Sequence, residues 1–463
     1  MKHSLLSYVR VLLLAGLLPA CNVGPNYERP ALPTAASYRG QSVESAGAAS
    51  LADQRWWELF DDETLRGLIE TALERNYDVR IAAARLLEVE AQLGATRADQ
   101  LPTLSAGLSA SETRRVAGVR IPPDRSYSAL LNASWEVDFW GKFRRATEAA
   151  RADVLATEWG RRAAVQSLVV QVASTYFVLR ALDQQLGIAT SALEARRDSL
   201  RLTQRREQSG QGSLLDVRQA EELVQIADGE RISLALQAEQ QENLLATLLG
   251  YQPGPVTRGQ PLAAQKLPPA VPAGLPSTLL ERRPDIQSAE QQLVSATAQV
   301  GVAQAQRLPS LNLTGSGGVV SGTLLALFTS PAAILNAAGS LVQPLFDGGQ
   351  LSAQVDAADA RAQQAALAYQ NTVLQALRDV SDALIGFQRN RELLASRDAL
   401  LEASRRALAL AELRYQGGSS SYLEVLDANS RQLDAEFALV RARLDALLSY
   451  VEVYRALGGG WQV

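Results

Sequence analysis

The chain contains the same design twice, with a period of 207 residues. Residues 74–104 and 281–311 align without a gap, and twelve of these 31 positions are identical. The register of 207 holds as far as Gly141 and Gly348, and it is 208 at Arg206 with Arg414 and at Gly210 with Gly418. Solenoid repeats are about 20–50 residues long. A period this long therefore indicates a duplicated half-molecule whose two copies supply similar walls to one structure.

The repeat predicts the organisation of the whole chain. We expect a first repeat over 51–250 and a second over 277–463, each with helices, two strands and a long helical hairpin. Residues 251–276 contain seven prolines and form a linker between them. Residues 21–50 are rich in Pro, Ala, Ser and Gly, which is typical of an extended segment, and residues 1–20 precede it as a separate signal.

The first twenty residues have the pattern of an export signal. Lys2 and Arg10 accompany an apolar run at 9–18, which is too short to remain as a membrane-spanning helix. The run ends at Leu-Pro-Ala-Cys21, which resembles a bacterial lipobox, and Cys21 is the only cysteine. We expect a lipid on Cys21 and sorting to the outer membrane, because Asn22 is not an inner-membrane retention signal. Plain signal cleavage that leaves an ordinary Cys21 is the alternative.

The residues that are missing exclude most enzyme chemistry. The only His is His3 and the only Met is Met1, so the mature sequence would contain neither. Serine–histidine and cysteine–histidine catalysis and imidazole or thiolate metal sites are therefore unavailable. We predict no enzyme, no cofactor and no metal site. The net charge is −4 before signal removal, and a basic stripe for nucleic acid is lacking.

Two short segments of the first repeat alternate between apolar and polar residues. They span 103–111 and 127–138, and 310–316 and 339–346 repeat the pattern less cleanly. Strands of about ten residues with one apolar face fit the wall of a membrane β-barrel, although a β-sandwich face gives the same alternation. In a barrel we expect Leu108, Ala129 and Leu131 to face lipid and Ser109, Asn132 and Ser134 to face the lumen.

Two very long helices are expected, one in each repeat. Residues 141–209 and 348–416 contain no proline and would extend for roughly 100 Å at 1.5 Å per residue. Paired apolar stripes suit helices that contact neighbours on both sides, as in a helical tube, and an antiparallel hairpin folded on itself is the alternative. Four strands cannot close a barrel that needs about eight, so strands in a membrane would require an oligomer.

The turns at the ends of these helices are the candidate functional positions. Each turn has an arginine four residues before a glycine, and an acid follows: Arg206, Gly210 and Asp216 in the first turn, and Arg414, Gly418 and Glu424 in the second. Ser421 and Glu424 predict a helix capping box, and Ser213 with Asp216 is a near version of it. Asp427 lies one helical turn beyond Glu424 and has no capping role, so it is either a functional carboxylate or part of a solvated face.

Several motifs together resemble one known family. Residues 22–30 (NVGPNYERP) behind the lipobox, Trp56-Trp57, 135–141 (WEVDFWG), 274–286 (GLPSTLLERRPDI) and 457–461 (LGGGW) are similar to the lipoprotein branch of the TolC-like outer-membrane efflux factors. The resemblance covers essentially all of the mature chain. It implies a mainly α fold with a membrane β-barrel portion, in which a homotrimer combines four strands per chain into a twelve-stranded barrel above a tunnel of long helices.

The resemblance also implies a function and its site residues. The chain would be an export duct for drugs or other small molecules, with a periplasmic adaptor and an inner-membrane pump as partners. Its gate would lie at the helical tips, at Tyr415, Glu424, Asp427 and Asp216. The adaptor would dock at the tips that carry Arg206, Gly210, Arg414 and Gly418. A basic tip residue of some members falls at Ser420, so the lock would differ here. A metal-ion duct and a lipid-anchored coiled-coil spacer without a pore are the alternatives.

Overall fold

The structure is a computed structural model of the 463-residue chain. It describes residues 22–31, 38–39, 51–53, 55–113, 124–267, 271, 273, 276–328 and 333–461. The predicted signal peptide and Cys21 lie outside these residues. The chain forms two compact units. The strand unit comprises Met1–Ala31, Arg85–Glu158 and Ser288–Gln370, and the hairpin unit comprises Leu32–Ala84, Trp159–Gln287 and Asn371–Val463. Each unit takes segments from both sequence repeats.

The elements follow each other twice in the same order, as the repeat predicts. The first copy contains η2 (Leu51–Asp53), α2 (Trp56–Leu59), α3 (Glu63–Arg75), α4 (Tyr77–Ala98), β1 (Thr103–Thr113), β2 (Asp124–Val137), α5 (Lys142–Gln208) and α6 (Leu214–Leu248). After η3 (Leu262–Ala264), the second copy contains α7 (Pro276–Arg282), α8 (Pro284–Ala305), β3 (Ser310–Ser321), η4 (Leu325–Phe328), β4 (Ala333–Val342), α9 (Gln350–Gln416) and α10 (Tyr422–Ala456). The two long helices have the predicted bounds to within two residues.

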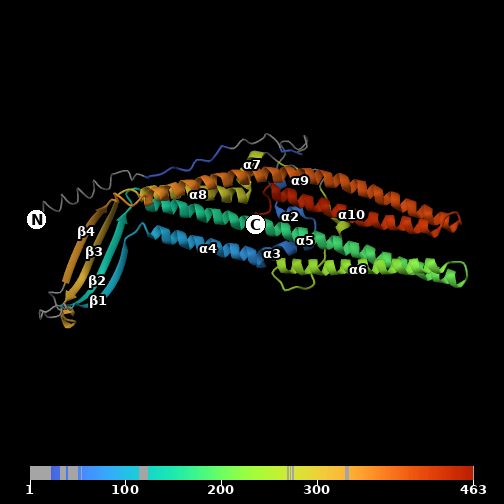
Figure 1. Ribbon diagram of the computed structural model, residues 1–463, viewed down its shortest axis with the longest axis horizontal. Helices are drawn as coiled ribbons and strands as arrows, with labels where there is room; N and C mark the ends of the chain where they lie inside the picture. The colour runs from blue at the N-terminus through green and yellow to red at the C-terminus, as the bar shows by residue number, and fades with distance from the viewer. Residues whose placement is uncertain are drawn as a thin grey trace. The chain divides into compact units, whose positions relative to one another are not determined.

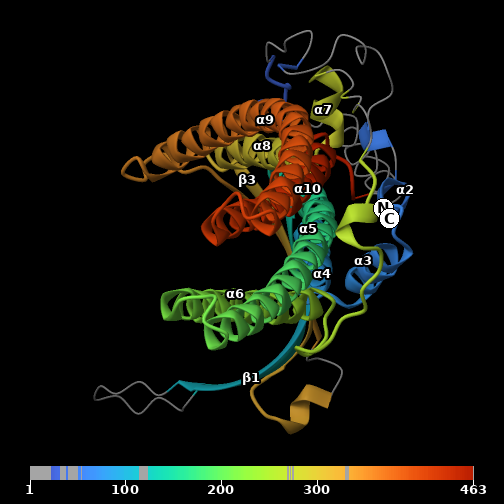
Figure 2. The ribbon, with the colours of Figure 1, turned by 90° about the vertical axis from the view of Figure 1, so that its right-hand side faces the viewer.

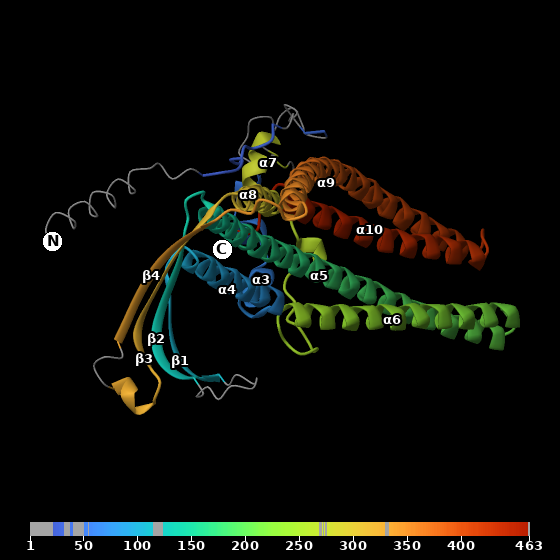
Figure 3. The ribbon, with the colours of Figure 1, turned by 60° about the vertical axis from the view of Figure 1, so that its left-hand side comes forward.

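The strand unit contains one curved antiparallel sheet in the order β1-β2-β3-β4 (Figure 3). The sheet has one apolar face, since Leu108 pairs with Ala129, Ala106 with Leu131 and Leu131 with Gly317. The opposite face is polar. Ser109 and Ser128 share a hydrogen bond there at 2.7 Å, and Asn132 pairs with Ser105 and Ser316. The sheet therefore sorts its residues onto the two faces that the alternation predicts.

The last strand differs from the prediction. We expected it at 339–346, but β4 ends at Val342, and Leu345 and Phe346 lie beyond it with more than nine-tenths of their surface exposed. Pro344 explains the end of the strand, because proline has no N–H to donate to a sheet. Within the described residues the outer edges of β1 and β4 make no strand pairing, so the sheet remains open at both sides.

The hairpin unit contains the two hairpins, in which α6 folds back along α5 and α10 folds back along α9 (Figures 1 and 2). Its core includes the fully buried side chains Tyr176, Leu179, Leu245 and Tyr454. Residues 251–267 of the proline-rich linker contact this core. Gln260 donates its backbone N–H to the buried carboxylate of Asp62 at 3.0 Å. The linker thus contacts the core of the hairpin unit, in which the long helices pack.

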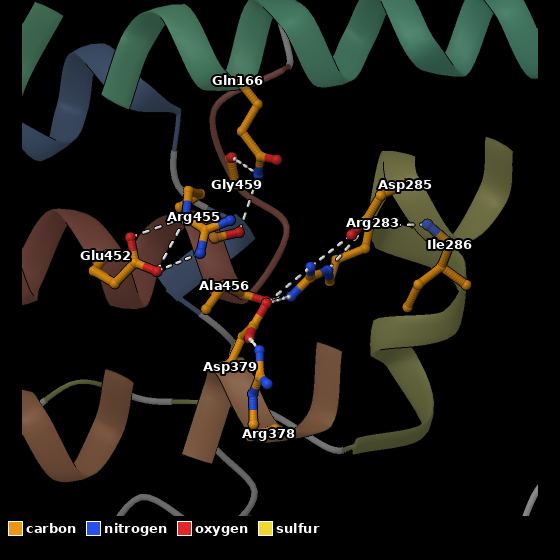
Figure 4. Close-up of polar contacts among 10 residues, drawn as sticks. All are labelled: Gln166, Arg283, Asp285, Ile286, Arg378, Asp379, Glu452, Arg455, Ala456 and Gly459. Carbon is orange, nitrogen blue, oxygen red and sulfur yellow. Dashed lines mark hydrogen bonds and ion pairs between the residues drawn. The ribbon is translucent and has the colours of Figure 1, made fainter. Parts of the chain in front are cut away.

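A polar network within the second repeat joins the junction of α7 and α8 to α9 and to the end of α10 (Figure 4). The guanidinium of Arg283, which is buried, donates to Asp285 at 2.6 Å and to the carbonyl of Ala456 at 3.3 Å, and lies 3.4 Å from Asp379. Burial opposes the ionisation of Asp285, but its contacts with Arg283 prevail and lower the pKa of this carboxyl. Asp379 therefore belongs to the structural framework of the hairpin unit.

Candidate gate at the helical tips

Both long helices end in the same way. Gly210 and Gly418 each have φ of +74°, the left-handed conformation that glycine adopts without strain. Beyond each glycine the chain turns back to hydrogen-bond an arginine carbonyl, Arg206 at 2.8 Å and Arg414 at 2.9 Å. These bonds satisfy carbonyls that the helix end would otherwise leave without partners. The two glycines that were assigned to adaptor docking therefore have a clear structural role at the tips.

The two return helices begin differently, and here one prediction was wrong. Ser421 is the N-cap of α10, but its side chain makes no capping hydrogen bond. The capping box forms instead at α6, where Ser213 and Asp216 exchange hydrogen bonds of 3.1 and 3.2 Å. The side chain of Glu424 forms an ion pair with Arg414 at 2.6 Å instead.

The two hairpins contact each other through Tyr415. Its hydroxyl accepts a hydrogen bond from Arg206, whose guanidinium also lies 5.4 Å from the centre of the tyrosine ring. Tyr415 lies beside Tyr422 with their ring centres 5.3 Å apart. Tyr422 in turn shares a hydrogen bond with Ser199. Two tyrosines of the second hairpin are therefore held by two residues of α5.

The predicted acidic residues are paired within the chain. Glu424 contacts Arg414, and Asp427 contacts Arg431 at 2.8 Å, four residues along α10. All four side chains are substantially exposed, and exposed ion pairs contribute about 0–1 kcal/mol each. Small changes at the tip can therefore break these pairs.

A cavity of about 500 Å³ lies between the tips. Its wall includes Arg206 and Asp216 from the first hairpin and Tyr415, Tyr422 and Leu426 from the second. Glu424 and Asp427 line a different cavity, of about 660 Å³, between α9 and α10. The structure thus brings Asp216 together with Tyr415 but separates them from the two acids of the second tip.

The sequence did not predict the partners of the candidate gate residues. Ser420 supplies no lock, since its buried hydroxyl makes no hydrogen bond with the described residues. The basic groups are Arg206 and Arg414, which had been assigned only to docking, and Arg431. Arg206 and Tyr415 are 209 residues apart, so the contact has no local signal in the sequence. Only the internal repeat points to it, because a separation of 209 residues is close to the period of 207 to 208 and so places both residues at equivalent tips.

Comparisons with known proteins agree with this architecture. The family model described as outer membrane efflux protein matches residues 68–251 and again 275–459. The chain is 34% identical to the solvent efflux pump outer membrane protein SrpC of Pseudomonas putida, over 100% of this chain and 99% of SrpC. It is 32% identical to the cation efflux system protein CusC of Escherichia coli, over 96% of this chain and 97% of CusC.

A solved structure of an outer-membrane channel also matches this chain over nearly its whole length. The outer-membrane channel OprN superimposes with a TM-score of 0.88 at 32% identity, over 96% of this chain and 100% of OprN. The match includes the strands and both hairpins, because almost the whole chain is covered.

Proposed function

The chain belongs to the outer membrane efflux protein family, and from this premise we propose that it is the outer-membrane duct of a tripartite efflux system. An inner-membrane pump and a periplasmic adaptor deliver drugs or other small organic molecules to it. It acts as a passage in the bacterial outer membrane and the periplasm, without a catalytic role. The observation that carries this proposal is the sheet with one apolar and one polar face, joined in one chain to two long hairpins.

The duct is a homotrimer. A closed barrel needs about eight strands or more, and lipid does not tolerate open sheet edges. One chain supplies four strands with two unpaired edges in its described part. Three copies supply twelve strands and remove every edge. The apolar face then contacts lipid and the polar face lines the lumen.

The main proposal and its alternative differ in the kind of substrate that the duct exports, organic molecules or metal ions. One relative is named for solvents and another for cations, so a metal-ion duct is the second candidate. The test is deletion of the gene, followed by growth on a panel of drugs, solvents and metal salts. Sensitivity to organic compounds supports the proposal, and sensitivity to metal salts alone supports the alternative. Heat-resistant trimers without single-channel conductance would instead indicate a spacer without a pore.

We propose that Tyr415, Glu424, Asp427 and Asp216 form the gate, with Arg206, Arg414 and Arg431 as their partners. Asp427 and Arg431 allow a test in which two substitutions should change cation block in opposite directions. Asp427→Ala removes a negative charge and frees Arg431, so block of the channel by multivalent cations from the periplasmic side should weaken. Arg431→Ala frees Asp427, so the same block should strengthen. Single-channel recording with a trivalent cation measures both, and equal block in the two variants would refute the assignment.

A conservative change tests the charge of Glu424. Glu424→Gln removes the charge that pairs with Arg414 but keeps the length of the side chain and a hydrogen-bond acceptor. We expect a stable trimer with weaker cation block. A trimer that loses thermal stability while cation block is unchanged would assign Glu424 a structural role at the tip instead.

We further propose that Cys21 carries the lipid anchor, because a lipobox-like sequence precedes this single cysteine. Mass spectrometry of the mature N-terminus should find residue 21 first and acylated. Cys21→Ser should lose the acyl mass and yet leave trimers in the membrane, since the barrel also holds them there. An unmodified Cys21 at the mature end would exclude the anchor.

A further inference from the structure

The first described residues lie along the strand unit in an extended form, and we call residues 22–29 the strap. The strap is held at its start, where the Val23 N–H donates to the carbonyl of Trp140 at 3.1 Å. It is held at its end, where Tyr27 and Arg29 both contact Glu290. Trp140 lies three residues after β2, and Glu290 lies in α8. The strap therefore connects the first repeat to the second.

The strap contacts two charged residues that are buried, Arg145 and Glu290. Arg145 is 2% exposed and donates to the carbonyls of Val23 and Gly24 at 3.2 Å each and to the Asn26 side chain at 2.8 Å. Glu290 is 5% exposed and accepts from Tyr27 at 2.8 Å and bidentately from Arg29 at 2.8 and 2.6 Å.

A buried charge is costly without a partner. Among the described residues, the hydrogen bonds that the side chain of Glu290 accepts come from the strap, and those from Arg145 go largely to it. With the strap in place, Tyr27 and Arg29 thus supply the donors that the buried carboxylate of Glu290 requires. Both groups are thus placed to bind this segment of the chain.

The backbone also fits the strap closely. Gly24 has φ of +99°, and a Cβ at this position would lie 2.4 Å from the Cα of Gly301 in α8. A Cβ on Gly301 would lie 2.8 Å from the Val23 carbonyl oxygen and 3.0 Å from Cγ of Arg145. Two glycines therefore let the strap touch the helix.

The internal repeat shows that, within the described residues, this set of contacts with the strap occurs in only one of the two copies, and we call the site formed by Arg145, Glu290 and Gly301 the strap groove. Glu290 corresponds to Ala83 at the offset of 207 residues, and Arg145 corresponds to Ala353 at the offset of 208 residues that relates α5 to α9. Gly301 corresponds to Gly94, where a Cβ would meet no atom within 4 Å. The second copy of the groove thus lacks both charges and the close contact.

We propose that Arg145, Glu290 and Gly301 form a dedicated binding site for the mature N-terminus. Through this site the strap joins the two repeats and fixes the start of the mature chain beside the β2–α5 junction. The site itself does not depend on the export function. A lipid on Cys21, if the proposed acylation is right, begins one residue before the strap and so enters the membrane at the rim of the barrel.

The two corresponding glycines give a matched test. A nitroxide on Glu28→Cys, in a Cys21→Ser background of the full-length trimer, reports the mobility of the strap by electron paramagnetic resonance. Gly301→Ala and Gly94→Ala raise helix propensity equally. We expect Gly301→Ala to lose the immobilised signal and Gly94→Ala to retain it. Equal signals in the two variants, or a mobile label already in the parent, would overturn the proposal.

A charge exchange provides the second test. Arg29→Glu should release the strap, because two carboxylates would then face each other. Arg29→Glu combined with Glu290→Arg should restore the immobilised signal. A strap that stays immobilised in the single variant would contradict the role of Glu290. Glu281→Gln, an exposed acid in α7, is the control and should have no effect.

Discussion

At the residue scale, the tips are held by contacts that are individually weak. Arg206 donates to Tyr415, Ser199 shares a hydrogen bond with Tyr422, and Arg414 pairs with Glu424. An ordinary hydrogen bond contributes about 0.5–1.5 kcal/mol to stability. In the gate that we propose, the loss of one contact is therefore enough to change the balance between closed and open tips without unfolding the hairpins.

The hydroxyl of Tyr415 allows this to be measured. Tyr415→Phe removes the acceptor for Arg206 and keeps the ring beside Tyr422. At about 0.5–1.5 kcal/mol, the open probability should rise roughly two- to tenfold. Single-channel recording detects the change. Tyr251→Phe, far along the chain from either tip turn, is the control, and equal behaviour of the two variants would exclude a gating role for the hydroxyl.

The sequence predicted which residues gather at the tips but not which ones pair. Glu424 was expected to cap its own helix and instead pairs with Arg414. Capping motifs depend on four consecutive residues, so they can be read locally. A competing arginine on the preceding helix cannot be read in this way, because its reach depends on the turn geometry between the helices.

At the scale of the elements, helices were easier to predict than strands. The bounds of α5 and α9 follow from the absence of proline over nearly seventy residues and from the glycines that end them. The strand β4 was misplaced because three of its ten residues are alanine, and its alternation of apolar and polar residues is weak. Its partner β3 fixes its register, and this pairing was invisible in the sequence.

The two faces of the sheet should respond differently to a charge. Leu108 is 87% exposed on the apolar face, and Ser109 lies next to it on the polar face. Leu108→Arg should cost about 2–4 kcal/mol if the residue lies near the membrane midplane, whereas Ser109→Arg should cost much less. Yield of heat-resistant trimer and its unfolding in denaturant measure both. Equal losses would contradict the assignment of the faces.

At the scale of the whole molecule, the two repeats are buried unequally. In α4 only Leu93 is buried among its residues, whereas the corresponding helix α8 buries Ile286, Leu293 and Val300 among others. In α4, Leu87 is 67% exposed and Tyr77 63%. Exposed apolar side chains on one helix indicate a contact with another copy of the chain. We therefore expect α4 to form part of the trimer interface.

This interface can be tested by a single charge. Leu87→Arg should lower the temperature at which the trimer dissociates, because the arginine must be desolvated when the copies meet. The helix content of the protein, measured by circular dichroism, should not change. Glu90→Arg introduces the same side chain at an exposed polar position of α4 and should have a smaller effect. Unchanged dissociation in Leu87→Arg would place the interface elsewhere.

The unequal repeats have a consequence for the symmetry of the assembled duct. A ring of three chains contains six related wall segments, but the groove that binds the strap occurs in only three of them. The two copies of the repeat alternate around the ring. The copy that contains α8 binds the N-terminal strap of its own chain, and the copy that contains α4 presents an exposed helix to the neighbouring chain. Because the two copies belong to one polypeptide, they can differ in sequence, so that one binds the strap and the other contacts the neighbouring chain. Six identical subunits could not differ in this way.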